Sequence, residues 1–220
     1  MPVGFERSKG TVKTWVALLC LASFGSVWAR EPLCSPRLET QEHGLTQREQ
    51  AALRTIARRA IASAVRGEAL PHFAVFSKRL EERRGVFVTL KKGGRLRGCI
   101  GCLTASTPLY LTVERMAIQA GTSDPRFPPL GKDELDDLEI EISVLGPLKP
   151  LEGVDEIVIG KHGVFILQGR HRGVLLPQVA LENGWDRETL LEHLSRKAGL
   201  PVDAWRSEKS RIYLFTAQVF

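Results

Sequence analysis

The chain has 220 residues, enough for one sizeable domain or two closely packed subdomains, and its 43% hydrophobic and 25% charged residues are ordinary for a soluble globular protein. The formal net charge of +6 is too diffuse to establish nucleic-acid binding by itself. Four cysteines, at positions 20, 34, 99 and 102, are too few for a disulfide scaffold at this length.

The first 29 residues have the layout of an export signal. Three basic residues precede an uncharged run over 14–29, and Val27 and Ala29 are small residues at the −3 and −1 positions of a cleavage site. The run is shorter than the ~20 residues that a membrane-spanning helix needs, so we expect no stable membrane span. We predict a signal-like leader over 1–29 with export to the periplasm. The alternative is that translation from an upstream start codon added residues that belong to no domain, in which case the protein is cytoplasmic.

A polar linker over residues 30–44 is predicted to lead into one domain over 45–220. Thr46 and Glu49 form a capping box, and apolar residues then follow helical spacing until Gly67 ends the first helix. Five arginines make this helix basic: Arg48, Arg54, Arg58, Arg59 and Arg66. Such a face is explained by solvation as well as by nucleic-acid contact.

Residues 86–90 and 95–101 are predicted to form a β-hairpin around the turn Lys92-Gly93-Gly94. Glycine is unfavourable inside a strand, so Gly98 and Gly101 indicate a bulge or the close approach of another group. The hairpin therefore presents its second strand, which carries a cysteine, at a site of unusual packing.

Cys99 on this strand admits two interpretations. Arg97 beside it is expected to favour the thiolate, which is the nucleophilic form of the side chain. Free cysteines are also among the most buried residues, so Cys99 could equally be a small core residue between glycines that only shape a turn. The spacing Cys99-x-x-Cys102 further allows a disulfide if the protein is exported.

A stiff loop follows the next predicted helix, which we expect to begin at the Thr107-Pro108 cap and to end at Gly121. The loop contains three prolines and presents Asp124 and Arg126 beside an aromatic ring. These two residues either pair with each other as a structural clip or bind a ligand. Further strands are predicted over residues 140–144, 164–167, 173–176 and 212–219, with a helix from the Asp186 cap to Gly199.

His162 lies at a predicted turn, where it is either a surface residue or a general base. A metal site is not predicted, because the chain has neither a second cysteine pair suited to zinc nor a His-x-x-x-His motif. The common nucleotide-binding and hydrolase motifs are also absent from the sequence.

Five segments together resemble the AMMECR-type domain, called AmmeMemoRadiSam system protein A in bacteria, over about residues 45–220. They are Leu96-Arg97-Gly98-Cys99-Ile100-Gly101, Asp124-Pro125-Arg126-Phe127-Pro128-Pro129, Ile159-Gly160-Lys161-His162-Gly163, Leu175-Leu176-Pro177-Gln178-Val179-Ala180 and Lys197-Ala198-Gly199-Leu200. The resemblance implies an α+β fold: one compact domain of two subdomains, with a mixed or antiparallel sheet flanked by helices and the signature segments around a cleft. It also implies genetic association with a Memo-like protein and a radical S-adenosylmethionine protein, which we take as its expected partners.

Two positions depart from the family pattern. Cys102 stands where the family usually has another residue, which weakens a shared mechanism based on a cysteine pair. Ser195 stands where the family often has a cysteine, so a mechanism that needs that second thiol would fail here.

Our leading hypothesis is an enzyme that uses Cys99 as nucleophile or covalent carrier and His162 as general base. Residues of the other segments, Arg97, Asp124, Arg126 and Gln178, are predicted to bind the substrate, which is a small molecule, a protein or RNA. The sequence does not identify a cofactor. The alternatives are a non-catalytic adaptor that uses the same cleft, and nucleic-acid binding through Arg54, Arg58 and Arg59.

Overall fold

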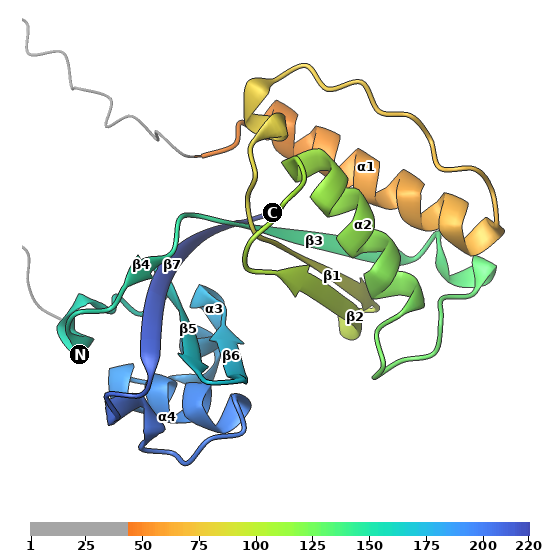
Figure 1. Cartoon of the computed structure of the whole chain (residues 1–220). Coiled ribbons are helices and arrows are strands. Elements are labelled where there is room, and N and C mark those ends of the chain that lie inside the picture. Colours follow the sequence, from red (N-terminus) through yellow and green to blue (C-terminus); the bar gives the residue numbers. More distant parts are fainter. Residues whose placement is uncertain (1–43) are drawn as a thin grey trace, which may run out of the picture. The chain divides into compact units, whose positions relative to one another are not determined.

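The computed structural model describes residues 44–220, which form an α+β domain on one curled antiparallel sheet (Figure 1). The helices are α1 (Gln47–Arg66), α2 (Leu109–Thr122), α3 (Pro177–Asn183) and α4 (Arg187–Lys197), with short 3-10 turns η1 (Lys78–Glu81), η2 (Lys132–Glu134), η3 (Val154–Glu156) and η4 (Ala204–Arg206). The strands are β1 (Val86–Lys92), β2 (Arg95–Cys102), β3 (Leu138–Leu145), β4 (Lys149–Pro150), β5 (His162–Gln168), β6 (His171–Leu175) and β7 (Arg211–Val219). The sheet order is β2-β1-β3-β7-β5-β6, and β4 pairs with β7. The predicted leader and linker lie outside the described residues, except for Gly44.

The first core lies between the helices α1 and α2 and one face of β1, β2 and β3. The capping box that starts α1 is present, and Gly67 ends the helix with a φ of 73° as predicted. Val86, Val88 and Leu90 of β1 are fully buried on this face. Their alternation along the strand leaves Phe87 and Thr89 on the opposite face of the sheet.

The glycines of β2 permit the close approach that the sequence predicts. A Cβ atom on Gly98 would lie 2.2 Å from the carbonyl oxygen of Ala120 in α2, and one on Gly101 would lie 2.3 Å from the ring of Phe87. The strand pairing is also irregular beside Gly98, because Leu90 pairs with Gly98 and Lys91 pairs with Leu96, which leaves Arg97 as an extra residue of β2. Gly98 is therefore required for packing helix α2 on the sheet.

Helix α2 differs from its predicted limits at both ends. Pro108, rather than Thr107, is the N-cap, and the Thr107 hydroxyl shares a hydrogen bond of 3.0 Å with the Thr112 hydroxyl instead. The helix continues to Thr122, because Gly121 serves packing rather than termination. A Cβ atom there would lie 2.8 Å from the Leu130 side chain, which covers the helix end.

The second core lies between β5, β6 and β7 and the helices α3 and α4. Asp186 caps α4 through the amide of Thr189, as predicted. Gly173 of β6 allows α4 to approach, since a Cβ atom there would lie 2.8 Å from the Leu194 carbonyl. The two cores correspond to the two predicted subdomains. A third apolar cluster connects them on the sheet face that carries Phe87. Within residues 44–220, no helix is both long and apolar enough to cross a membrane.

Candidate functional site

The two cysteines of β2 face opposite sides of the sheet. Cys102 pairs with the fully buried Val86 and packs against the first core, whereas Cys99 pairs with Thr89 on the other face. The Cys99 thiol and the Thr89 hydroxyl share a hydrogen bond of 3.2 Å. Both cysteines are free and half-buried. Because their side chains point apart, the Cys99–Cys102 disulfide that the spacing allowed does not fit this strand.

Asp124 fixes the backbone of β2 at Cys99. Asp124 is 4% exposed, and its carboxylate accepts hydrogen bonds from the Cys99 amide (2.8 Å) and from the Arg126 guanidinium (2.7 and 3.0 Å). The same guanidinium also donates to the Cys99 carbonyl at 3.2 Å. The predicted pairing of Asp124 with Arg126 is therefore present. The pair also holds Cys99 in place by hydrogen bonds to its backbone amide and carbonyl groups.

Charge keeps this clip ionised. The hydrogen bonds from Arg126 hold the pKa of Asp124 well below its usual range, although burial of the carboxyl opposes the shift. Hydrogen bonding to Asp124 raises the pKa of Arg126 in turn. Because the Arg126 side chain is 53% exposed, its cation faces solvent and can meet an anionic group of a substrate.

Lys197, the last residue of α4, contributes a second cation in electrostatic contact with both Cys99 and Arg126. Burial of its ammonium group lowers the pKa of Lys197, interaction with Cys99 opposes the shift, and the Arg126 cation adds to it. The residue as a whole is exposed, so solvent moderates these effects. Two of the signature segments, β2 and the loop after α2, thus meet at Cys99 through hydrogen bonds, and the end of α4 interacts with this residue electrostatically.

Arg97 does not have the role beside the thiol that the sequence predicts. Its guanidinium donates to both carboxylate oxygens of Glu134 (3.0 and 2.8 Å) and to the carbonyl of Pro128 (2.9 Å). Both members of this ion pair are largely buried, with side chains 13% and 16% exposed. The geometry therefore gives Arg97 the task of holding the proline-rich segment on β2. Arg126 hydrogen-bonds to the Cys99 carbonyl, and Lys197 interacts with Cys99 electrostatically.

The Arg97–Glu134 pair predicts a pH dependence of stability. Hydrogen bonds from Arg97 and from the Gly131 amide lower the pKa of Glu134 to about 2. A lowered carboxyl pKa stabilises the fold fully above the ordinary value of 4.5, and this contribution is lost as the pH falls towards 2. We expect Glu134→Gln to lower the free energy of unfolding by about 2–3 kcal/mol at pH 7 and to flatten its pH dependence between about pH 5 and 2.

Urea unfolding across this pH range measures both effects. Glu208→Gln is the matched control, because Glu208 is an exposed surface residue. An unchanged stability of Glu134→Gln at pH 7, equal to that of the control, would contradict the assignment.

His162 lies in a different neighbourhood. Its strand, β5, is four positions from β2 in the sheet order. The ring Nδ1 atom is 3.0 Å from the carbonyl oxygen of Glu156 and 3.2 Å from the amide nitrogen of Val158. The residue lines a cavity of about 440 Å³ with Lys149, Phe215 and other residues of β7. These contacts do not join His162 to Cys99, so its role as general base stays a prediction without geometric support.

Gln178 occupies the second position of α3, a helix too short to be recognised from its apolar spacing. Its side-chain Oε1 atom is buried and accepts no hydrogen bond from the described residues. The predicted role of Gln178 in substrate binding therefore also stays a prediction.

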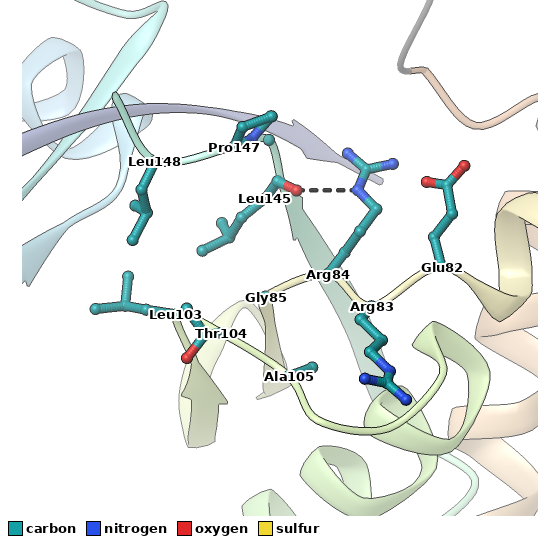
Figure 2. A pocket seen from close by; sticks show the side chains of 11 residues that line it. Glu82, Arg83, Arg84, Gly85, Leu103, Thr104, Ala105, Leu145, Pro147 and Leu148 are labelled. Carbon is teal, nitrogen blue, oxygen red and sulfur yellow. Dashed lines mark hydrogen bonds between the residues drawn. The ribbon is translucent and has the colours of Figure 1, made fainter. Parts of the chain in front are cut away.

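A cavity of about 590 Å³ opens near the ends of β1 and β3 (Figure 2). Its lining combines apolar side chains, such as Leu103 and Leu148, with the arginines Arg83 and Arg84. Arg84 donates from Nε to the Leu145 carbonyl at 3.0 Å, and burial lowers the pKa of its guanidinium. The predicted site residues do not line this cavity, so it is separate from the group around Cys99.

Sequence reasoning missed two residues of the Cys99 neighbourhood, Thr89 and Lys197. The sequence marks Lys197 as a residue of interest, because it begins one of the signature segments. It gives no reason to place this residue near a cysteine. Thr89 is not marked in this way, because its role depends on the pairing of β1 with β2. Over residues 44–220, no cluster of three or more metal-ligating side chains is present.

Known proteins share this fold and much of this sequence. The family model AMMECR1 matches residues 54–220. Protein MK0488 of Methanopyrus kandleri is 48% identical over 153 residues (66% of this chain, 74% of that protein), and Protein NEQ441 of Nanoarchaeum equitans is 39% identical over 175 residues (76% and 97%). The crystal structure of uncharacterized protein PH0010 from Pyrococcus horikoshii has a TM-score of 0.72 and 39% identity, covering 76% of this chain and 88% of its own. The resemblance inferred from the five segments is thus confirmed, and the chain belongs to the AMMECR1 family.

Proposed function

We propose that this protein is a group-transfer enzyme in which Cys99 is the nucleophile or covalent carrier. The observation that supports the proposal is that the Asp124–Arg126 pair holds the backbone of the half-buried Cys99, with which Lys197 also interacts electrostatically. A cysteine that only fills space needs neither two nearby cations nor a clamped backbone. Cys102, three residues further along the same strand, packs against the core.

Each group has a task that its environment suits. The cations Arg126 and Lys197 favour the thiolate form of Cys99, and Thr89 orients the sulfur by its hydrogen bond. Arg126 binds an anionic part of the substrate from its solvent-facing side. The thiolate then attacks an electrophilic carbon: the S–C bond forms, the bond to the leaving group breaks, and the Lys197 ammonium group gives a proton to the leaving group and regains one from solvent.

Acyl transfer from a small thioester tests this step. The full chain is incubated with an S-acetyl thioester, and acetylated cysteine is located by mass spectrometry. We expect acetylation of Cys99 in the Cys102→Ser variant, slowed about tenfold or more by Lys197→Met, because loss of a general acid typically costs this much or more. Acetylation of Cys102 in the Cys99→Ser variant at an equal rate would overturn the proposal, and so would no acetylation of either cysteine in folded protein.

The cellular setting is also a proposal. The family resemblance supports action beside a Memo-like protein and a radical S-adenosylmethionine protein, and the layout of residues 1–29 supports export. N-terminal sequencing of the protein from its native cells tests the location. A chain that begins at Arg30 in the periplasmic fraction is expected, and an intact leader in the cytoplasm would exclude export.

A further inference from the structure

The exposed face of α1 concentrates positive charge. Its five arginines, Arg48, Arg54, Arg58, Arg59 and Arg66, are all exposed. At about 100° per residue they fall within an arc of about 140°, and the small residues Ala51, Thr55 and Ala62 occupy the positions between them. The opposite face of the helix is buried in the first core. The charge is therefore presented in one direction along the helix.

This charge is not neutralised by the domain itself. Among the ion pairs of residues 44–220, none involves an arginine of α1. Three of the guanidinium groups lie over phenyl rings instead: Arg48 over Phe76 (4.4 Å), Arg54 over Phe220 (5.2 Å) and Arg59 over Phe73 (5.4 Å). The surface thus alternates cations with aromatic rings.

Two cavities flank the arginines. The segment over residues 68–77 runs beside α1 (Figure 1), and a cavity of about 260 Å³ between them contains Phe73 and Phe76. A second cavity, of about 200 Å³, lies on the other side of the helix between Arg54, Arg58 and Ile140. Thr55 and Arg59 line both, so the two cavities adjoin across the helix.

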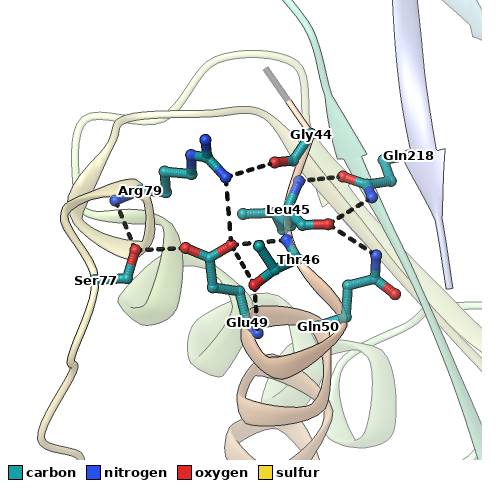
Figure 3. A network of polar contacts seen from close by, with 8 residues as sticks. All are labelled: Gly44, Leu45, Thr46, Glu49, Gln50, Ser77, Arg79 and Gln218. Carbon is teal, nitrogen blue, oxygen red and sulfur yellow. Dashed lines mark hydrogen bonds and ion pairs between the residues drawn. The ribbon is translucent and has the colours of Figure 1, made fainter. Parts of the chain in front are cut away.

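The end of this segment is held firmly against the start of α1 (Figure 3). The buried carboxylate of Glu49 accepts hydrogen bonds from the Ser77 hydroxyl and from the Thr46 amide and hydroxyl. Arg79 forms an ion pair with the same carboxylate at 3.8 Å and donates to the Gly44 carbonyl. Phe76, 51% exposed, is therefore displayed from a fixed support next to Arg48.

We infer that this α1 face and the segment over 68–77 form a binding surface for single-stranded nucleic acid. Guanidinium groups bind phosphodiester oxygens, and unpaired bases stack on phenyl rings and on guanidinium planes. The flanking cavities suit single splayed bases, which a duplex does not offer. The surface carries no part of the Cys99 chemistry, so the inference goes beyond the proposed function and stands independently of it.

Fluorescence anisotropy with labelled 15-nucleotide oligo-dT and oligo-U measures nucleic-acid binding by this surface in the full chain. We expect binding at 50 mM salt that weakens steeply as salt increases. The variant Arg54→Gln/Arg59→Gln/Arg66→Gln should bind about tenfold or more weakly, with a salt slope reduced by about 2. Phe76→Ala should weaken binding about fivefold through loss of stacking. The tighter of the two oligonucleotides identifies DNA or RNA as the class.

A matched control comes from the other end of the domain. Arg170, Arg172 and Arg211 form a second exposed basic group, since Leu167 pairs with both Arg172 and Arg211. Their triple exchange to Gln removes the same charge and should change affinity less than twofold. Equal losses from the two triple variants, tighter binding of a 15-bp duplex, or binding only to vesicles that contain phosphatidylserine would overturn the inference.

Discussion

Replacing Asp124 by alanine is expected to lower the free energy of unfolding by about 2–4 kcal/mol. The exchange leaves the Cys99 amide without its acceptor and removes the partner of Arg126 from a site that is 4% exposed. The solvent-facing side of Arg126 keeps the loss below that of a fully buried pair. Urea unfolding measures it, and Asp136→Ala, at an exposed position, should change stability by less than about 0.5 kcal/mol.

The same pair also predicts how the stability of the protein depends on pH in acid. Because the pKa of Asp124 is lowered, its stabilisation is fully present above the ordinary value of 3.8 and is lost only as the pH falls well below that value. The wild type should therefore lose stability at low pH more steeply than Asp124→Ala does. If the free energies of unfolding of the two proteins had the same pH dependence, the Asp124 carboxylate would not stabilise the fold in its ionised form.

The exchange Gly98→Ala is expected to destabilise the protein by about 3 kcal/mol. The new Cβ atom would lie 2.2 Å from the Ala120 carbonyl oxygen, which is backbone of α2 and can move only with the helix. Gly153→Ala is the matched control, because nothing lies within 4 Å of its Cβ position and its φ of −148° suits any residue. A Gly98→Ala variant as stable as this control would show that α2 shifts without cost.

Local signals predicted much of the fold. The Thr46 capping box, the Asp186 cap and the alternating strands act within a few residues, so their patterns are legible in the sequence. Gly121 led to a wrong prediction of the end of α2. This glycine makes room for the Leu130 side chain, and helical spacing within α2 does not reveal that contact. The strand β4 and the helix α3 are too short for periodicity to reveal.

The candidate site was harder to predict than the fold. The pairing of Asp124 with Arg126 is local and was foreseen, but their grip on Cys99 depends on how the loop after α2 folds back onto β2. Charge alone suggested Arg97 as the cation beside the thiol, whereas Glu134, 37 residues away, takes up that guanidinium. The electrostatic interaction of Lys197 with Cys99 depends on the packing of α4, which no spacing in the sequence encodes.

Alkylation of the two cysteines of β2 tests the central claim most directly. Iodoacetamide rates are compared for variants that retain only Cys99 or only Cys102, both half-buried in the native fold. We predict that Cys99 reacts at least about tenfold faster, and that Lys197→Met slows it while the neighbouring Arg196→Met does not. If Cys99 reacts no faster than Cys102, or only once the protein unfolds, the thiol is structural and the AMMECR1 domain binds rather than catalyses.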